Sequence, residues 1–193
     1  QRVHQNDLVG HLLDRNASLV VGIASSMVLA RLLTPAEVGV YSVTVVLMSF
    51  ATSFRDFGAG QYLVQERELN TERIQAVWTL QLAIGVLLCL LALGASAVMP
   101  AFYREPRMRE VLWVLALSYV INPFGSLTYA WLMREMRFEL LTVMRLSGTL
   151  AGAAVSIGLA WRGLGPISLA WGTLTSVATN AAVTRTAIWM PVR

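Results

Sequence analysis

The chain has 193 residues, of which 56% are hydrophobic and only 13% are charged, and its mean hydropathy is +0.60. This composition excludes a soluble domain with a polar exterior and predicts a membrane protein. The net charge of +4 does not indicate a nucleic-acid partner, because the basic residues are spread over short segments between apolar runs and do not gather on one polar face.

Six apolar runs follow one another along the chain, and each is long enough to cross a bilayer as a helix, which takes about 20 residues. They cover residues 8–33, 36–64, 72–99, 107–133, 138–161 and 166–189. The first, second and fifth runs carry a few charged residues within the apolar stretch. The sequence therefore predicts an all-α polytopic membrane protein built as a bundle of six transmembrane helices.

The connection between the first two predicted helices carries helix-start chemistry. Thr34 offers a hydroxyl N-cap, Pro35 suits the first helical position, and Glu37 stands three residues after the cap. This pattern is a capping box, so we expect the first helix to turn tightly into the second.

The arginines between the helices predict the orientation. Successive connections lie on alternating sides of the membrane. One side has Arg2, Arg67, Arg73, Arg134, Arg137, Arg185 and Arg193, and the other has Arg31, Arg104, Arg107, Arg109 and Arg162. Because cytoplasmic loops are richer in basic residues, the first side, with the N-terminus, is predicted to be cytoplasmic.

Two further patterns concern helix shape and packing. Pro123 lies near the middle of the fourth predicted helix, where it removes a backbone hydrogen bond and should bend the helix; a static kink and a transport hinge both fit. Small residues recur at four-residue spacing and predict close helix packing. They are Ser18, Gly22, Ser26 and Ala30 in the first helix, Gly148, Gly152 and Ser156 in the fifth, and Gly172 and Ser176 in the sixth.

Arg15, Arg55 and Arg145 fall well inside predicted spans, away from the connections. With a rise of 1.5 Å per residue, Arg15 and Arg145 lie roughly 10 Å, and Arg55 about 14 Å, from the cytoplasmic helix ends. A charge at the bilayer centre costs about 2.5 to 3.5 kcal/mol, so it normally faces a cavity or a partner. If the first, second and fifth helices converge, these arginines form a cationic vestibule that holds phosphate oxygens. Snorkelling to head groups is the alternative for Arg15 and Arg145.

Polar residues accompany the arginines. Asp14 and Asp56 are candidates for proton or cation coupling, because burial raises the pKa of a carboxyl group; an interhelical ion pair is the alternative for Arg55 and Asp56. Asn180 continues a polar stripe of the sixth helix and is a cavity candidate. The other stripes include Ser42, Ser49, Ser53, Asp56 and Gly60 in the second helix and Thr142, Arg145, Thr149, Gly152 and Ser156 in the fifth.

Five blocks of the sequence resemble one known family. They are VLARLLTPAEVGVYSV (28–43), FRDFGAGQYLVQERELN (54–70), FYREPRM (102–108), VLWVLALSYVI (111–121) and LMREMRFELLTV (132–143). In these blocks the chain resembles the polysaccharide transporter family, the Wzx-type oligosaccharide flippases of the multidrug/oligosaccharidyl-lipid/polysaccharide (MOP) superfamily. The resemblance marks Arg31, Leu33, Pro35, Gly39 and Tyr41, and then Asp56, Phe57, Gly58, Gly60 and Gln65, as signature positions.

This resemblance implies a function and an incomplete architecture. Such flippases carry oligosaccharides linked through pyrophosphate to a polyprenol across the bacterial inner membrane, and they place two lobes around a central cavity. We expect residues 1–193 to be the N-terminal six-helix lobe of a MOP/MATE-like two-lobe transporter, a fragment that lacks the second lobe. The expected partners are the lipid-linked oligosaccharide and membrane lipids.

Two alternatives differ in function class. A cation-coupled multidrug exporter of the same superfamily predicts a more acidic, aromatic-lined cavity, whereas the charges here lean to arginine. A polytopic glycan polymerase or phosphoglycosyl transferase is a remote alternative, because it needs paired carboxylates, a metal cluster or a nucleophile in a sizeable loop. The two histidines, His4 and His11, have no further ligands beside them. We therefore expect no enzyme activity, no metal and no cofactor.

Overall fold

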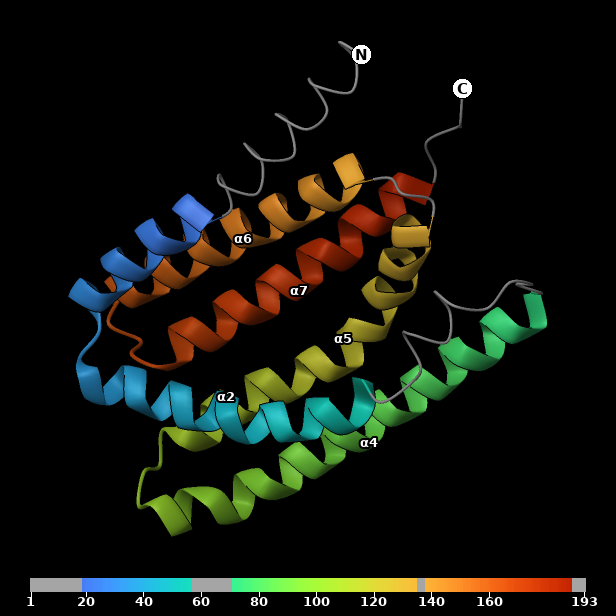
Figure 1. Cartoon of the computed structure of the whole chain (residues 1–193). Helices are drawn as coiled ribbons and strands as arrows, with labels where there is room; N and C mark the ends of the chain where they lie inside the picture. Colours follow the sequence, from blue (N-terminus) through green and yellow to red (C-terminus); the bar gives the residue numbers. More distant parts are fainter. Residues whose placement is uncertain (1–18, 57–70, 135–137, 189–193) are drawn as a thin grey trace.

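The structure is a computed structural model of the chain, and it describes residues 19–56, 71–134 and 138–188. These residues form six helices and no strand, which confirms the all-α prediction. The first described helix is Leu19–Leu32, and the others, labelled as in Figure 1, are α2 (Pro35–Asp56), α4 (Thr71–Tyr103), α5 (Met108–Arg134), α6 (Phe138–Trp161) and α7 (Ile167–Ile188).

In the described part of the chain, two helices are long and apolar enough to cross a membrane. The segments Trp78–Tyr103 and Leu140–Trp161 have 26 and 22 residues and mean hydropathies of 2.5 and 1.5. Large apolar side chains are exposed along α4, among them Leu87, Leu90 and Val98. Because water would penalise such a surface, it is suited to lipid. The chain is a membrane protein with an all-α fold.

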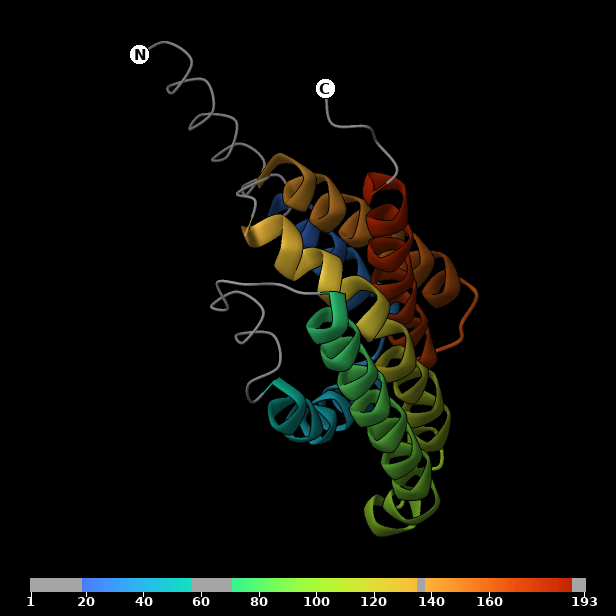
Figure 2. The same cartoon turned by 90° about the vertical axis from the view of Figure 1, so that its right-hand side faces the viewer.

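Helix α5 holds the bundle together. It contacts α2, α4, α6 and α7, and Figures 1 and 2 show α4 beside its first half. Helix α7 follows both halves of α5, because Val111 and Leu115 pack with Ala170 and Gly125 faces Ala181. Helix α6 packs near the end of α5, where Leu132 meets Leu141 and Met144. The Tyr119 hydroxyl of α5 donates to the Met48 carbonyl oxygen of α2 at 2.7 Å. Helix α2 is also joined to α7, because the hydroxyl oxygens of Tyr41 and Thr173 lie 2.7 Å apart.

Small residues bring α6 and α7 together as an antiparallel pair. A Cβ atom added to Gly152 would lie 2.8 Å from the Gly172 carbonyl oxygen and 3.1 Å from the Ser176 Cβ atom. One added to Gly172 would overlap the Ser156 hydroxyl, and one added to Gly148 would overlap the Asn180 carboxamide. The small-residue stripes predicted for these two helices therefore form their shared interface, which confirms the close-packing prediction for them. For the first helix the prediction is wrong among the described residues, because no atom lies within 4 Å of a Cβ added to Gly22, and Ser26 and Ala30 are exposed.

The α4–α5 pair is equally close at Pro123, which lies inside α5. A Cβ atom added to Gly85 of α4 would lie 2.6 Å from the Tyr119 carbonyl oxygen and 3.3 Å from the Pro123 Cγ atom. Proline has no N–H to donate to the carbonyl four residues earlier, which is that of Tyr119. Helix α5 is bent in Figure 1, as the proline predicted.

Three connections meet at one end of the bundle, on the left of Figure 1. The capping box is formed as predicted, since the Thr34 N–H donates to Glu37 Oε2 at 2.8 Å and the Glu37 N–H donates to Thr34 Oγ1 at 3.4 Å. The Glu37 carboxylate also lies 3.7 Å from Arg107 in the α4–α5 connection. It abuts Gly165 in the α6–α7 connection, where an added Cβ atom would lie 2.9 Å from Glu37 Oε1.

Candidate functional site

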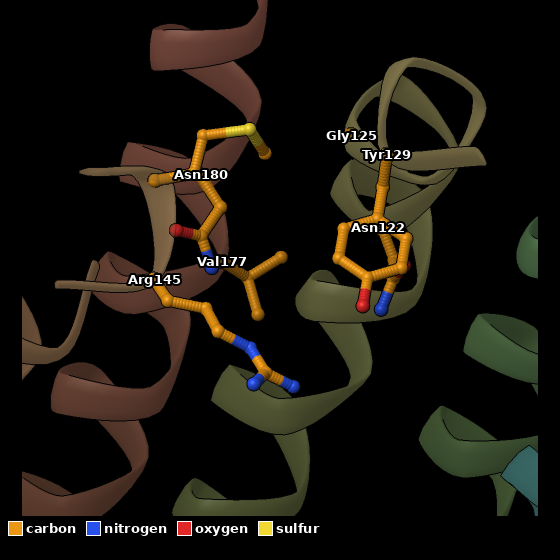
Figure 3. Close-up of a pocket in the computed structure, with 7 residues that line it drawn as sticks. Asn122, Gly125, Tyr129, Arg145, Val177 and Asn180 are labelled. Carbon is orange, nitrogen blue, oxygen red and sulfur yellow. The ribbon is translucent and has the colours of Figure 1, made fainter. Parts of the chain in front are cut away.

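A pocket of about 280 Å³ opens between the second half of α5 and the α6–α7 pair (Figure 3). It is lined by Asn122, Gly125 and Tyr129 of α5, Met144 and Arg145 of α6, and Val177 and Asn180 of α7. Local sequence explains why these side chains share a wall. Asn122, Gly125 and Tyr129 stand three and four residues apart, which places them on one face of α5.

Arg145 is the charged group of this pocket. It stands in the second turn of α6, inside the apolar segment Leu140–Trp161, and its side chain is exposed. Figure 3 shows the guanidinium group directed across the pocket toward α5. Among the side chains that the structure describes, no carboxylate forms a salt bridge with it. The guanidinium can therefore bind an anion that enters the pocket.

Asn180 supplies an amide on the same wall. Its carboxamide packs against Gly148, where an added Cβ atom would overlap it. Its Oδ1 atom is buried and has no hydrogen-bond partner among the described residues. A buried carbonyl oxygen without a donor costs about 1 to 3 kcal/mol. This oxygen packs against α6 and is not open to the pocket.

Asn122 and Tyr129 complete the polar lining, and sequence reasoning did not select either as a site residue. Their spacing of seven residues on α5, with Gly125 between them, was the signal available. A carboxamide both donates and accepts, and a phenol does the same, so the two groups suit hydroxyl-bearing ligands. Met144, which is 4% exposed, and Val177 give the pocket an apolar side.

The structure places the predicted site residues unequally. It brings Arg145 and Asn180 to one pocket, and Pro123 lies in α5 directly after the pocket residue Asn122. Asp14 and Arg15 lie outside the described residues. Arg55 and Asp56 end α2, and their side chains lie outside the described part of the chain. The convergence of three arginines on a vestibule therefore stays a prediction.

The polar stripes have different surroundings. In α2 the hydroxyls of Ser42, Ser49 and Ser53 are exposed and donate to carbonyls of their own helix at 2.7 to 2.9 Å. In α7 the stripe is mostly packing surface, because Ser168 is fully buried and Gly172 abuts α6. Only Asn180, at the far end of that stripe, lines the pocket. Among the described residues, no three His, Cys, Asp or Glu side chains gather in a way that fits a metal ion.

Comparison with known proteins decides the family. Residues 28–192 match the profile of a family described as polysaccharide biosynthesis protein. The chain belongs to this family. The match includes the four helices that form the Arg145 pocket and its supports, α4, α5, α6 and α7, and it confirms the resemblance to polysaccharide transporters.

Relatives of this polysaccharide biosynthesis family carry names that agree with it. The chain is 23% identical to the lipopolysaccharide biosynthesis protein WzxC of Escherichia coli over 137 residues, and this aligned segment covers 71% of this chain and 28% of that protein. It is 24% identical over 156 residues to the succinoglycan biosynthesis transport protein ExoT of Rhizobium meliloti, 81% of this chain and 31% of that protein. It is 27% identical over 93 residues to the teichuronic acid biosynthesis protein TuaB of Bacillus subtilis, 48% of this chain and 19% of that protein.

The chain thus spans less than a third of the length of these curated relatives. No solved structure matches it.

Proposed function

We propose that this chain is the N-terminal six-helix lobe of a transporter that flips a lipid-linked oligosaccharide across the bacterial inner membrane for polysaccharide biosynthesis. The cargo is a glycan repeat unit joined through pyrophosphate to a polyprenol, and the N-terminus lies on the cytoplasmic side. Support comes from the family match over residues 28–192 and from relatives named for lipopolysaccharide biosynthesis and succinoglycan transport.

The observation that carries this proposal is the guanidinium of Arg145, which lines an open pocket, belongs to an apolar helix and has no carboxylate partner among the described side chains. A charged side chain in hydrocarbon costs about 2.5 to 3.5 kcal/mol, so a membrane helix keeps one where an anion or a water-filled cavity receives it. A guanidinium group donates two parallel hydrogen bonds to phosphate oxygens. Arg145 would hold the diphosphate of the cargo.

The rest of the pocket supports a glycan beside that diphosphate. Asn122, Tyr129 and Asn180 offer amide and phenol groups for sugar hydroxyls,. A volume of about 280 Å³ is at the lower limit for a small-molecule site and holds only the part of an oligosaccharide nearest the lipid. The remaining sugars would lie against the exposed serines of α2, Ser42, Ser49 and Ser53, and against the second lobe.

The transport cycle needs groups beyond this pocket. We assign Arg15 and Arg55 to the cationic cavity and Asp14 and Asp56 to ion coupling, as their positions in the apolar segments predict. Pro123 would be the hinge of α5, since it adjoins the pocket residue Asn122 and already bends the helix. The second lobe would close the cavity on the other side and allow alternating access. No enzymatic step is part of this cycle.

Complementation tests the proposal. The full-length gene is expressed in a strain that lacks its own flippase, and surface polymer is compared at equal membrane expression. We expect Arg145→Ala to reduce polymer at least tenfold, as loss of about 1.4 kcal/mol or more of phosphate binding would do, and Arg145→Lys to restore part of it. Arg162→Ala, an exposed arginine in the α6–α7 connection, is the matched control. Full polymer with Arg145→Ala would overturn the role of this pocket.

A further inference from the structure

A second pocket lies at the other end of α5, where α4 connects to it. It has a volume of about 420 Å³ and is lined by Ser96, Ala97, Pro100, Ala101, Arg104, Pro106 and Arg109. Asn122 of the first pocket follows Arg109 by thirteen residues, so about 20 Å of helix separates them at a rise of 1.5 Å per residue. The two pockets therefore face opposite ends of the bundle.

Two guanidinium groups line this second pocket, those of Arg104 and Arg109. The third arginine of the connection, Arg107, takes the salt bridges, to Glu37 at 3.7 Å and to Glu105 at 3.9 Å. Within the described part of the chain, Arg104 and Arg109 lie within 4 Å of no carboxylate. The pocket thus holds two positive charges that remain available to an anion.

The position of Arg109 is fixed by an aromatic ring. Its guanidinium carbon lies 5.6 Å from the centre of the Trp113 ring, within reach of a cation–π interaction. The Trp113 Nε1–H donates to the Ser96 hydroxyl oxygen at 2.8 Å, and the Ser96 hydroxyl donates to the Leu93 carbonyl. Ser96 is buried, so it anchors the ring, and the ring holds the guanidinium at the pocket.

The pocket lies beside features that are typical of a membrane surface. It adjoins the end of the apolar segment Trp78–Tyr103, and three aromatic side chains, Phe102, Tyr103 and Trp113, are exposed around it. Exposed aromatic residues at helix ends are typical of the boundary between hydrocarbon and head groups. Apart from Ser96 and the two arginines, the lining is apolar and consists of Ala97, Ala101 and two prolines.

We propose that this pocket binds the phosphate head group of an anionic phospholipid in the leaflet on that side, with Arg104 and Arg109 as the phosphate ligands. Basic pockets next to membrane helices bind such head groups through charge-assisted hydrogen bonds. The apolar wall and the exposed rings would contact the glycerol and upper acyl region, which favours a lipid over free phosphate. This proposal does not rest on the transport function, because Arg145 takes no part in it.

Lipid titration of the purified full-length protein in detergent, followed by native mass spectrometry, tests this site. The probes are phosphatidylglycerol, phosphatidylcholine with the same acyl chains, and inorganic phosphate. We expect the wild type to prefer phosphatidylglycerol and the Arg104→Ala/Arg109→Ala double variant to bind it about 30-fold more weakly, since each arginine near the membrane surface contributes about 1 kcal/mol. The Arg162→Ala control should bind as the wild type does.

Two results would overturn the proposal. One is equal phosphatidylglycerol binding by the wild type and the double variant. The other is inorganic phosphate binding that depends on the two arginines while phosphatidylglycerol binding does not, which would make this a free-anion site. Should the alanine pair not fold, the Arg104→Gln/Arg109→Gln pair removes both charges at similar side-chain length and gives the same comparison.

Discussion

Adding one methyl group at two glycines of α6 should have opposite effects on stability. At Gly152 the new Cβ atom would lie 2.8 Å from the Gly172 carbonyl oxygen and 3.1 Å from the Ser176 Cβ atom. A helix backbone carbonyl yields little, so α6 and α7 must separate, and overpacking of this kind costs about 1 to 3 kcal/mol. At Gly158 no atom lies within 4 Å of the added Cβ atom, so alanine fits without displacement.

The helix-propensity gain is common to both substitutions. Replacing a helical glycine by alanine stabilises a helix by about 0.5 to 1 kcal/mol. Gly158→Ala should therefore raise the free energy of unfolding by that amount. Gly152→Ala should lower it by up to about 2.5 kcal/mol, because the overpacking cost exceeds the same gain. The difference between the two variants is then the overpacking cost alone.

The assay is unfolding of the purified protein in mixed micelles by titration with sodium dodecyl sulfate, followed by circular dichroism. The two variants carry the same added atoms in the same helix, so each is the other's control. A midpoint for Gly152→Ala equal to or above that for Gly158→Ala would refute the close α6–α7 packing.

Two further predictions concern α5 and its connection to α4. Tyr119→Phe should lower the free energy of unfolding by about 0.5 to 1.5 kcal/mol, because it removes the 2.7 Å hydrogen bond to the α2 carbonyl,; the same titration measures it, and an unchanged midpoint would contradict it. Arg104 has a φ of 54°, which is a left-handed backbone conformation. In this conformation a residue with a Cβ atom, such as alanine, is strained by about 1 to 2 kcal/mol, and glycine is not. Arg104→Gly should therefore unfold at a higher midpoint than Arg104→Ala, and the reverse order would exclude strain at this position.

Helix ends were predictable because their signals are local. Thr34 and Glu37 are three residues apart, and the structure forms the capping box that this spacing predicts. The α6 segment was predicted over 138–161, and the helix runs Phe138–Trp161, since charged and glycine-containing connections border it. The end of α4 was harder to predict, because the helix continues past Pro100 to Tyr103. The residue after the helix, Arg104, has the left-handed backbone conformation that glycine usually adopts at this position,.

The pocket was only half predictable because its walls are far apart in the sequence. A charge in an apolar run marked Arg145, and a polar stripe marked Asn180. Gly172 and Asn180 lie on the same face of α7, but Gly172 packs against α6 and Asn180 lines the pocket. The polar stripe in the sequence does not distinguish these two environments. The contribution of Asn122 and Tyr129 depends on how α5 crosses the α6–α7 pair, and a single sequence carries no signal for that crossing.

The most direct measurement for the central claim is the rate at which the full-length protein, reconstituted into liposomes, moves a fluorescent pyrophosphate-linked glycolipid between leaflets. If Arg145 holds the diphosphate within the pocket, Arg145→Ala should slow this rate at least tenfold, because the variant loses about 1.4 kcal/mol or more of phosphate binding. Arg162→Ala should move the lipid at the wild-type rate. Equal rates for Arg145→Ala and the wild type, at equal reconstitution, would contradict the account.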